Sequence, residues 1–391
     1  MKSWKLVLCA SAFSLGLAGL GVAHADPLAS PAMTAPLSSN ANPLSVDAGP
    51  LGKIYVSGQV SGIGYTQSHP TDNGVGDKSS YGDLSNAQVE IQKTDGPIQF
   101  YIQAGQYSLM SLGTQYVKSD IVTPLTYTNV PVAYLKVAPT SSFSVMAGRL
   151  PTLIGAEYTF SFQNMNIERG LLWNQEPAIS QGVQVNYSHG PLSMSFAVTD
   201  GFFSSKLSTL SGLASYAIDS KDTIAFAGSG NVSNYTRPAT FVTSTTLQNS
   251  QVFNLMYTRT DGPYLIEPYL QYTHVDANPA AGIPNSASTW GAAVLAKYSF
   301  NPEISLAGRV EYISASGGPN TASATNLLYG PHSNAFSLTI TPTWQRKAVF
   351  VRGEFSYTHA SDILPGFGFG VDSGFNHKDQ TRGVIEAGIM F

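Results

Sequence analysis

Apolar and polar side chains alternate with a period of two residues along most of this chain, and the segment 289–300 shows the pattern best. Trp290, Val294 and Phe300 all belong to its apolar set. A strand that alternates in this way has one apolar and one polar face. Trp290 and Phe300 are separated by about 25 Å along a barrel axis, at about 3.3 Å per residue and a tilt of about 40°. This is the height of the apolar band of an outer-membrane barrel, with an aromatic residue at each edge.

The composition supports the same fold class. Only 11% of the 391 residues are charged, whereas soluble domains carry about 25%. The 43% hydrophobic content argues against disorder, and the net charge of −4 argues against a nucleic-acid-binding protein. No apolar run of 18 residues follows Ala25, which excludes a helical membrane span. We therefore expect an all-β transmembrane protein, an antiparallel up-and-down β-barrel.

The alternation predicts about sixteen strands with long loops at one end and short turns at the other. The predicted ranges are 53–67, 84–93, 98–109, 128–138, 143–150, 178–189, 192–200, 210–219, 223–234, 251–260, 264–275, 289–300, 304–315, 335–345, 348–358 and 381–391. The short connectors are rich in Gly, Pro and Asp, the residues of tight turns. The segments 128–138 and 210–219 alternate least clearly, so 14 and 18 strands stay open. A soluble β-sandwich is the alternative for this strand content.

The first 52 residues precede the barrel. Residues 1–25 have the organisation of a cleaved signal peptide: Lys2 and Lys5, an apolar stretch, and the cleavage site Ala23-His24-Ala25. An uncleaved N-terminal anchor is the alternative. Cleavage would remove Cys9, the chain's one cysteine, so no disulfide or thiolate site is expected. Residues 26–52, rich in Pro and Ala, are predicted to form a flexible periplasmic arm or, alternatively, a short plug, and residues 53–391 the barrel.

Charged residues on the polar faces of the strands are candidates for the wall of a water-filled lumen. A barrel of about sixteen strands is too wide to be filled by side chains of its wall. The candidate pore-lining residues are five cations and five anions: Lys136, Lys297, Arg309, Arg352, Arg382, Glu90, Glu267, Glu311, Glu354 and Glu386. Gln, Ser, Thr and Asn are expected at most other inward positions. Balanced charge predicts weak ion selectivity, although these charges could simply neutralise one another within the wall.

The third long loop is the most informative connection. The segment 148–177 is long, aromatic and charged, so it can fold inward and narrow the lumen. Its candidate constriction residues are Arg149, Glu157, Glu168, Arg169 and Glu176. A cap on the outer surface, without contact to a solute, is the alternative.

The same region carries a family resemblance. Gly148-Arg149, the run 154–157, the run 164–169, Pro177 and the strand 181–187 together resemble the OmpL-like outer-membrane β-barrel porin family. The resemblance implies an outer-membrane porin that passes small hydrophilic solutes by passive diffusion. One departure is Glu168-Arg169-Gly170, where a Ser-Arg-Ser-like run is expected.

Other functions have weaker support in the sequence. Catalysis would need a wall or rim triad, and the best pairs are His274 with Asp276 and His359 with Asp362. Residues 72–77 lack the spacing of a calcium loop. We therefore expect no enzyme, no cofactor and no metal site. A channel selective for a sugar or an organic acid is one alternative, and a plugged structural or adhesive barrel is another.

The expected partners follow from an outer-membrane location. They are outer-membrane lipid and lipopolysaccharide, small hydrophilic solutes, and further copies of the chain in a homotrimer. Phe391 ends an alternating strand and resembles the signal that the barrel-assembly machinery recognises.

Overall fold

The computed structural model describes residues 35–40, 42–72, 74–233, 244–316, 325 and 327–391. The predicted signal peptide, residues 1–25, lies outside them. No helix in these described ranges is both long and apolar enough to cross a membrane.

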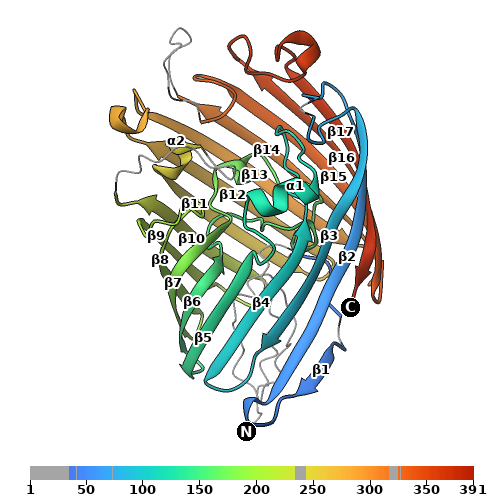
Figure 1. The fold of residues 1–391 in the computed structure, drawn as a ribbon, viewed down its shortest axis with the longest axis vertical. Helices are drawn as coiled ribbons and strands as arrows, with labels where there is room; N and C mark the ends of the chain where they lie inside the picture. The colour runs from blue at the N-terminus through green and yellow to red at the C-terminus, as the bar shows by residue number, and fades with distance from the viewer. Residues whose placement is uncertain (1–34, 41, 73, 234–243, 317–324, 326) are drawn as a thin grey trace.

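Strands dominate the described chain (Figure 1). Their bounds are β1 (Leu44–Asp47), β2 (Lys53–Gln67), β3 (Ser80–Lys93), β4 (Ile98–Tyr107), β5 (Val132–Thr140), β6 (Phe143–Pro151), β7 (Ile179–His189), β8 (Leu192–Thr199), β9 (Thr209–Ala217), β10 (Asp222–Asn231), β11 (Ser250–Asp261), β12 (Tyr264–Val275), β13 (Ala287–Ser299), β14 (Ile304–Ala315), β15 (Asn334–Arg346), β16 (Val349–Ser361) and β17 (Asp379–Met390). Each strand from β2 to β17 pairs antiparallel with its sequence neighbours, and β17 pairs with β2. The result is a closed barrel of sixteen strands, as predicted, and the counts of 14 and 18 are excluded.

The helical elements of the described residues are short and lie in connections. The α-helices are α1 (Ser119–Leu125) and α2 (Thr245–Gln248), and the 3-10 turns are η1 (Gly49–Leu51), η2 (Ser161–Gln163), η3 (Leu172–Gln175), η4 (Pro279–Ala281) and η5 (Val371–Ser373). Long loops lie at one end of the barrel and short turns at the other. The predicted strand 128–138, one of the two that alternate least clearly, starts four residues too early, because β5 begins at Val132.

Burial along β13 confirms which face is apolar. Trp290 is 65% exposed, and Phe300, just beyond the strand, is 59% exposed, while Thr289 and Leu295 on the opposite face are buried. A closed barrel that places large apolar side chains on its exposed face is adapted to lipid outside. We call the strand positions opposite to these exposed ones the inner face.

The barrel closes at the C-terminus. Phe391 N–H donates to the Gly58 carbonyl, and Gly58 N–H donates to the Phe391 carbonyl, each over 2.8 Å. A Cβ atom at position 58 would lie 2.7 Å from the Phe391 ring and 2.5 Å from the Gln88 carbonyl oxygen. Gly58 therefore allows the terminal aromatic ring to cover the seam.

Gly58→Val is expected to destabilise this closure, because backbone on one side and the ring on the other leave no room for a side chain. We expect a loss of about 1–3 kcal/mol of unfolding free energy, the usual cost of overpacking. Unfolding in urea, followed by the gel shift between folded and heated barrel, measures it. Gly64→Val on the same strand is the control, since a Cβ there would meet only an Ile385 methyl group at 3.6 Å. An equal loss in both variants would contradict the packing explanation.

Part of the predicted N-terminal arm is ordered against the barrel. β1 pairs with the start of β2, from Leu44 with Val56 to Asp47 with Lys53. It occupies the edge of β2 that β17 leaves free, and its own side chains are exposed. Upstream, Leu37 is buried and its N–H donates to the Phe162 carbonyl over 3.0 Å. β1 is too short for its alternation to be recognised in the sequence, because its four residues place only two side chains on each face.

Candidate functional site

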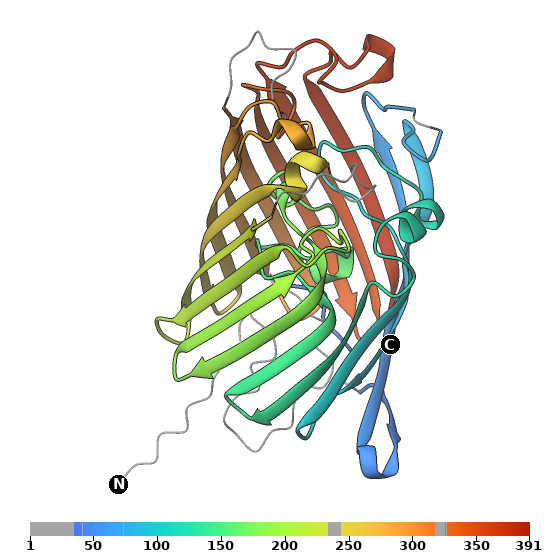
Figure 2. The ribbon, with the colours of Figure 1, turned by 60° about the vertical axis from the view of Figure 1, so that its left-hand side comes forward.

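The connection between β6 and β7, residues 152–178, is the most buried long loop of the described chain. We call it loop 3. Both ribbon views draw it among the strands rather than beyond their ends (Figure 2). It has little regular structure, so its backbone groups need partners from elsewhere. The strand side chains supply many of them.

Two wall carboxylates accept backbone N–H groups of loop 3. Glu354 on β16 accepts from Ile167 and Glu168 over 2.5 and 2.9 Å, and Thr341 also donates to it. Glu311 on β14 accepts from Leu171 over 2.9 Å, from Leu172 over 3.3 Å and from the Ser337 hydroxyl over 2.7 Å. Hydrogen bonds to an ionised carboxylate are about twice as strong as neutral ones. The path of the loop is thus fixed through its main chain.

Gly170 explains the departure from the expected Ser-Arg-Ser-like run. A Cβ atom at position 170 would lie 2.1 Å from an oxygen of the Glu311 carboxylate. The N–H of Gly170 donates to Glu157 over 2.8 Å. A residue with a side chain would therefore push the loop off its anchoring carboxylate.

Arg309 on β14 joins the wall to the loop. Its guanidinium forms an ion pair with Glu157 of loop 3 and donates to the Glu168 carbonyl over 2.8 Å. It also contacts Glu311 on its own strand at 3.2 Å. All three side chains are buried, so their charges interact in a medium of low dielectric constant.

Two further buried arginines complete the network. Arg382 on β17 forms an ion pair with Glu168 of loop 3 and donates to Gln67 over 2.9 Å. Arg352 on β16 pairs with Glu386 and donates to the Asn164 carbonyl over 3.1 Å. Glu386 in turn accepts from the Ser161 hydroxyl of the loop over 2.7 Å. The structure therefore brings together six of the ten candidate wall residues with loop 3.

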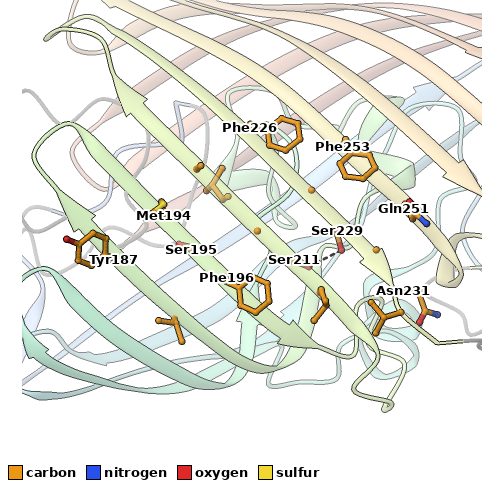
Figure 3. Close-up of a pocket in the computed structure, with 18 residues that line it drawn as sticks. Tyr187, Met194, Ser195, Phe196, Ser211, Phe226, Ser229, Asn231, Gln251 and Phe253 are labelled. Atoms are coloured by element: carbon orange, nitrogen blue, oxygen red, sulfur yellow. Dashed lines mark hydrogen bonds between the residues drawn. The ribbon is translucent and has the colours of Figure 1, made fainter.

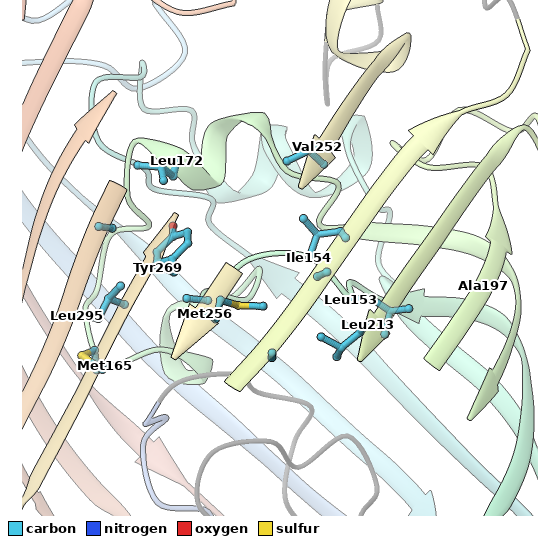
Figure 4. Packing of buried hydrophobic residues seen from close by; sticks show 14 of the residues in the cluster. Leu153, Ile154, Met165, Leu172, Ala197, Leu213, Val252, Met256, Tyr269 and Leu295 are labelled. Atoms are coloured by element: carbon cyan, nitrogen blue, oxygen red, sulfur yellow. The ribbon is translucent and has the colours of Figure 1, made fainter. Parts of the chain in front are cut away.

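On the opposite side, loop 3 packs through apolar contacts. Leu153, Ile154, Met165 and Leu172 form a cluster with buried residues of β8 to β14 (Figure 4). The wall members are Ala197, Leu213, Ala225, Ala227, Val252, Met256, Tyr269, Ala293, Leu295 and Ala307. The expectation that polar residues fill most inward positions is therefore wrong for this sector. The physical reason is that these positions face the loop's apolar side chains.

The second long loop, between β4 and β5, also contacts loop 3. Leu112 N–H donates to the Arg169 carbonyl over 2.9 Å, and Arg169 N–H donates to the Met110 carbonyl over 3.1 Å. The Arg169 guanidinium lies over the Trp173 ring at 5.3 Å. No sequence signal marked this pairing, because it joins two irregular segments far apart in the chain.

The remaining candidates take no part in the ion pairs described above. Arg149 belongs to β6 rather than to the loop, and it donates to the Thr128 hydroxyl over 2.8 Å. Glu90 on β3 is buried and accepts from the Ser57 hydroxyl over 3.3 Å. The other wall candidates are Glu267, buried on β12, and Lys136 and Lys297, half-buried on β5 and β13.

The histidine pairs weighed for catalysis lie at the loop end of the barrel. His274 contacts Asp276 at 3.2 Å, and His359 contacts Asp379 at 2.7 Å rather than Asp362. The Asp276 and Asp379 side chains are 79% and 48% exposed, which is typical of solvated surface pairs.

The comparisons with known proteins agree with this architecture. A family model described as "Putative beta-barrel porin-2, OmpL-like" matches residues 53–391. The chain belongs to this porin family. A comparison with curated proteins gives no match. The porin resemblance predicted from the sequence is thus confirmed, and so is the location in the bacterial outer membrane.

Solved structures share the porin's fold at low identity. Outer-membrane expressed OmpT of Vibrio cholerae is 13% identical, covers 90% of this chain and 100% of its own, and has a TM-score of 0.57. An anion-selective porin from Comamonas acidovorans is 10% identical, covers 86% and 99%, and has a TM-score of 0.55. The outer membrane channel DcaP of Acinetobacter baumannii is 11% identical, covers 86% and 97%, and also has a TM-score of 0.55. At these identities the likeness concerns the fold alone.

A groove of this porin lies on its outer face. The groove, of about 700 Å³, lies over β7 to β11. Figure 3 shows Phe196, Phe226 and Phe253 among the residues that line it. Its floor includes Gly212 and Gly228, which are register partners on β9 and β10. The residues that line it include no charged side chain. The groove therefore belongs to the lipid-facing surface rather than to the inner face.

Glu176 of loop 3 is a buried carboxyl to which no described residue donates a hydrogen bond. Burial, assisted by the carboxylates of Glu157 and Glu311, raises its pKa well above the usual range. Above a pH of about 4.3, the Glu176 carboxyl ionises in the unfolded chain but stays protonated in the folded one. The free energy of unfolding therefore falls as the pH rises above this value.

Glu176→Gln is therefore expected to gain stability over the parent as the pH rises above about 4.3, by up to about 1.4 kcal/mol per pH unit. The two proteins should be alike near pH 4. Urea unfolding at several pH values measures the difference. Glu303→Gln, at a half-buried turn position with Arg346 as its partner, is the control. A constant difference between pH 4 and 8 would contradict the titration of Glu176.

Proposed function

We propose that the protein is an outer-membrane porin with a water-filled channel for passive diffusion of small hydrophilic solutes, narrowed by loop 3. The observation that carries the proposal is the closed sixteen-strand barrel of a porin family, with polar and charged side chains on its inner face. A barrel of this strand number is too wide to be filled by its wall residues. On this proposal the barrel acts as a passage, not as an enzyme.

The contacts of loop 3 support its role as the constriction. It is anchored to β14, β16 and β17 by charged side chains and to β8–β14 by apolar ones. A segment held on both sides is expected to keep one position during solute passage. Solute size would then be limited by the space left beside the loop.

The extensive burial of loop 3 favours a second candidate function, that of a plugged barrel. The second long loop and loop 3 are hydrogen-bonded to each other, and most of loop 3 is buried. A barrel occluded in this way would be structural or adhesive. It would share every feature of the outer wall with the porin.

Single-channel conductance separates the two candidates. The refolded chain without residues 1–25 is inserted in planar bilayers, and the reversal potential is measured in a KCl gradient. We expect stable open steps with weak ion selectivity. Silence from protein that is folded and inserted, as shown by its heat-dependent gel shift and by protection in vesicles, would contradict the porin and favour the plugged barrel.

The partners and the maturation of the chain belong to the same proposal. We infer cleavage after Ala25, recognition of Phe391 by the assembly machinery, contact with lipid and lipopolysaccharide, and assembly as a homotrimer. A trimer form of Vibrio cholerae OmpT, 11% identical with a TM-score of 0.57, shares the fold and supports the last point. Mass spectrometry of the native protein from outer membranes tests both the N-terminus, expected at Asp26, and the copy number. A mature chain that retains residues 1–25 would contradict cleavage.

A further inference from the structure

A small cavity lies at the turn end of the barrel, between loop 3 and the first described residues of the chain. Its volume is about 220 Å³. One side is formed by β13, β14 and β15, and another by residues 35–38. Asn164 and Met165 of loop 3 contribute to its lining. The space exceeds what a few water molecules need, at about 30 Å³ each in the liquid, and it suits a solute of a few heavy atoms.

The strand side of this cavity carries three hydroxyl groups in one register row. Ser299 on β13 pairs with Ser305 on β14, and Ser305 pairs with Thr343 on β15. All three line the cavity. Because neighbouring strands are about 4.8 Å apart, the row presents hydroxyl groups over about 10 Å. Each hydroxyl can donate to an oxygen of a ligand.

Lys297 adds the charge. It lines the same cavity, and it precedes Ser299 by two residues, which puts both on one face of β13. Within the described ranges, no carboxylate lies within ion-pair distance of its ammonium group, in contrast to Lys93 and Lys221. A half-buried ammonium next to hydroxyl groups is a combination that oxyanions recognise.

The acidic groups nearby already have partners. Glu303 lines the cavity, and its carboxylate contacts Arg346 at 3.3 Å. Continuing the register row, Thr343 pairs with Arg352, which forms an ion pair with Glu386. Both acidic groups are therefore engaged with arginines rather than with Lys297.

The N-terminal segment closes the cavity on the side away from the strands. Ser38 N–H donates to the side-chain oxygen of Gln345 over 2.9 Å, and the Gln345 amide donates back to the Ser38 carbonyl over 2.7 Å. Leu37 N–H donates to Phe162 of loop 3. These contacts hold the segment against both the wall and the loop.

We propose that this cavity is a binding site for a small carboxylate, in which the Lys297 ammonium pairs with the carboxylate and the Ser299 hydroxyl on the same strand donates a hydrogen bond to it, while Ser305 and Thr343 offer donors to further oxygens of the ligand. The site lies at the turn end of the inner face, where a permeating solute would leave or enter the barrel. It goes beyond diffusion, because it gives the barrel a preferred ligand. Its occupancy does not require conduction.

Fluorine NMR of trifluoroacetate tests the site in the refolded chain without residues 1–25, in an uncharged detergent. Saturable line broadening that acetate reverses is the expected result. Lys297→Gln should raise the half-saturation concentration at least about tenfold, because a charge-assisted hydrogen bond is lost. Lys136→Gln, which removes the other half-buried lysine among the wall candidates, should change it less than about twofold.

Several outcomes would overturn the proposal. They are an absence of saturable broadening, equal weakening by both lysine substitutions, equal broadening of the neutral trifluoroacetamide, and displacement by phosphate at far lower concentration than by acetate. The last would assign the cavity to another oxyanion. Since binding is measured without a bilayer, a silent barrel that still binds trifluoroacetate would contradict the porin and leave the site in place.

Discussion

Replacing residues 153–177 by a short Gly-Ser linker is expected to raise the single-channel conductance at least about twofold, because the proposed constriction is removed from the lumen. The same change should admit larger polyethylene glycols into the channel. The wall charges that loop 3 neutralises would then face water, where their solvation replaces the lost contacts. Conductance steps in planar bilayers measure the effect.

The matched control replaces most of the eighth long loop, residues 363–377, by the same linker. That segment is mostly exposed or half-buried and joins β16 to β17 at the loop end. We expect its removal to leave the conductance unchanged. Because a deletion can disturb folding, the double variant Glu311→Gln with Glu354→Gln provides a milder test. It weakens the main-chain anchors of loop 3 and should make the current noisier. Unchanged steps in both loop 3 variants would contradict the constriction.

Arg309→Met is expected to cost about 3–5 kcal/mol of unfolding free energy, the usual result of breaking a buried ion pair. The substitution leaves the carboxylates of Glu157 and Glu311 buried without their cation. It should also release the loop, since Arg309 donates to the Glu168 carbonyl. Urea unfolding in lipid vesicles gives the free energy, and limited proteolysis reports exposure of the loop.

The control for this prediction is Arg346→Met, which removes an exposed partner of Glu303. An exposed pair of this kind is worth about 0–1 kcal/mol. Adding Glu157→Gln to Arg309→Met should recover part of the loss, because one unpaired charge is then removed. If Arg309→Met costs no more than Arg346→Met, the network does not stabilise the fold in the way we describe.

The wall of the barrel could be predicted closely because lipid imposes a strict period. Each position of β13 either faces lipid or does not, so counting alone assigns Trp290 and Leu295 to opposite faces. The same counting places β2, β12 and β14 at their observed bounds. The predicted strand 128–138 starts four residues before β5, because it includes Asn129 and Pro131, residues typical of turns.

The interior could be predicted only in part. The alternation along the strands identifies Arg309, Glu311 and Glu354 as inward-facing. It does not indicate whether they bind a loop or face a solute. The inward apolar positions, such as Leu213 and Met256, escape prediction because apolar residues on both faces of a strand erase the alternation. β1 and the packing of Leu37 against loop 3 could not be predicted, because such short segments show no recognisable alternation.

Loop 3 is anchored through its own main-chain amides, so the backbone conformation of this segment depends little on which side chains it carries. Glu311 and Glu354 bind main-chain N–H groups at positions 167, 168, 171 and 172. Main-chain N–H groups are the same for every residue except proline. Side chains of the loop that do not touch the wall can therefore be exchanged while the backbone keeps its course. Protein engineering could therefore change the selectivity of this barrel by substituting such side chains one at a time on an unchanged backbone.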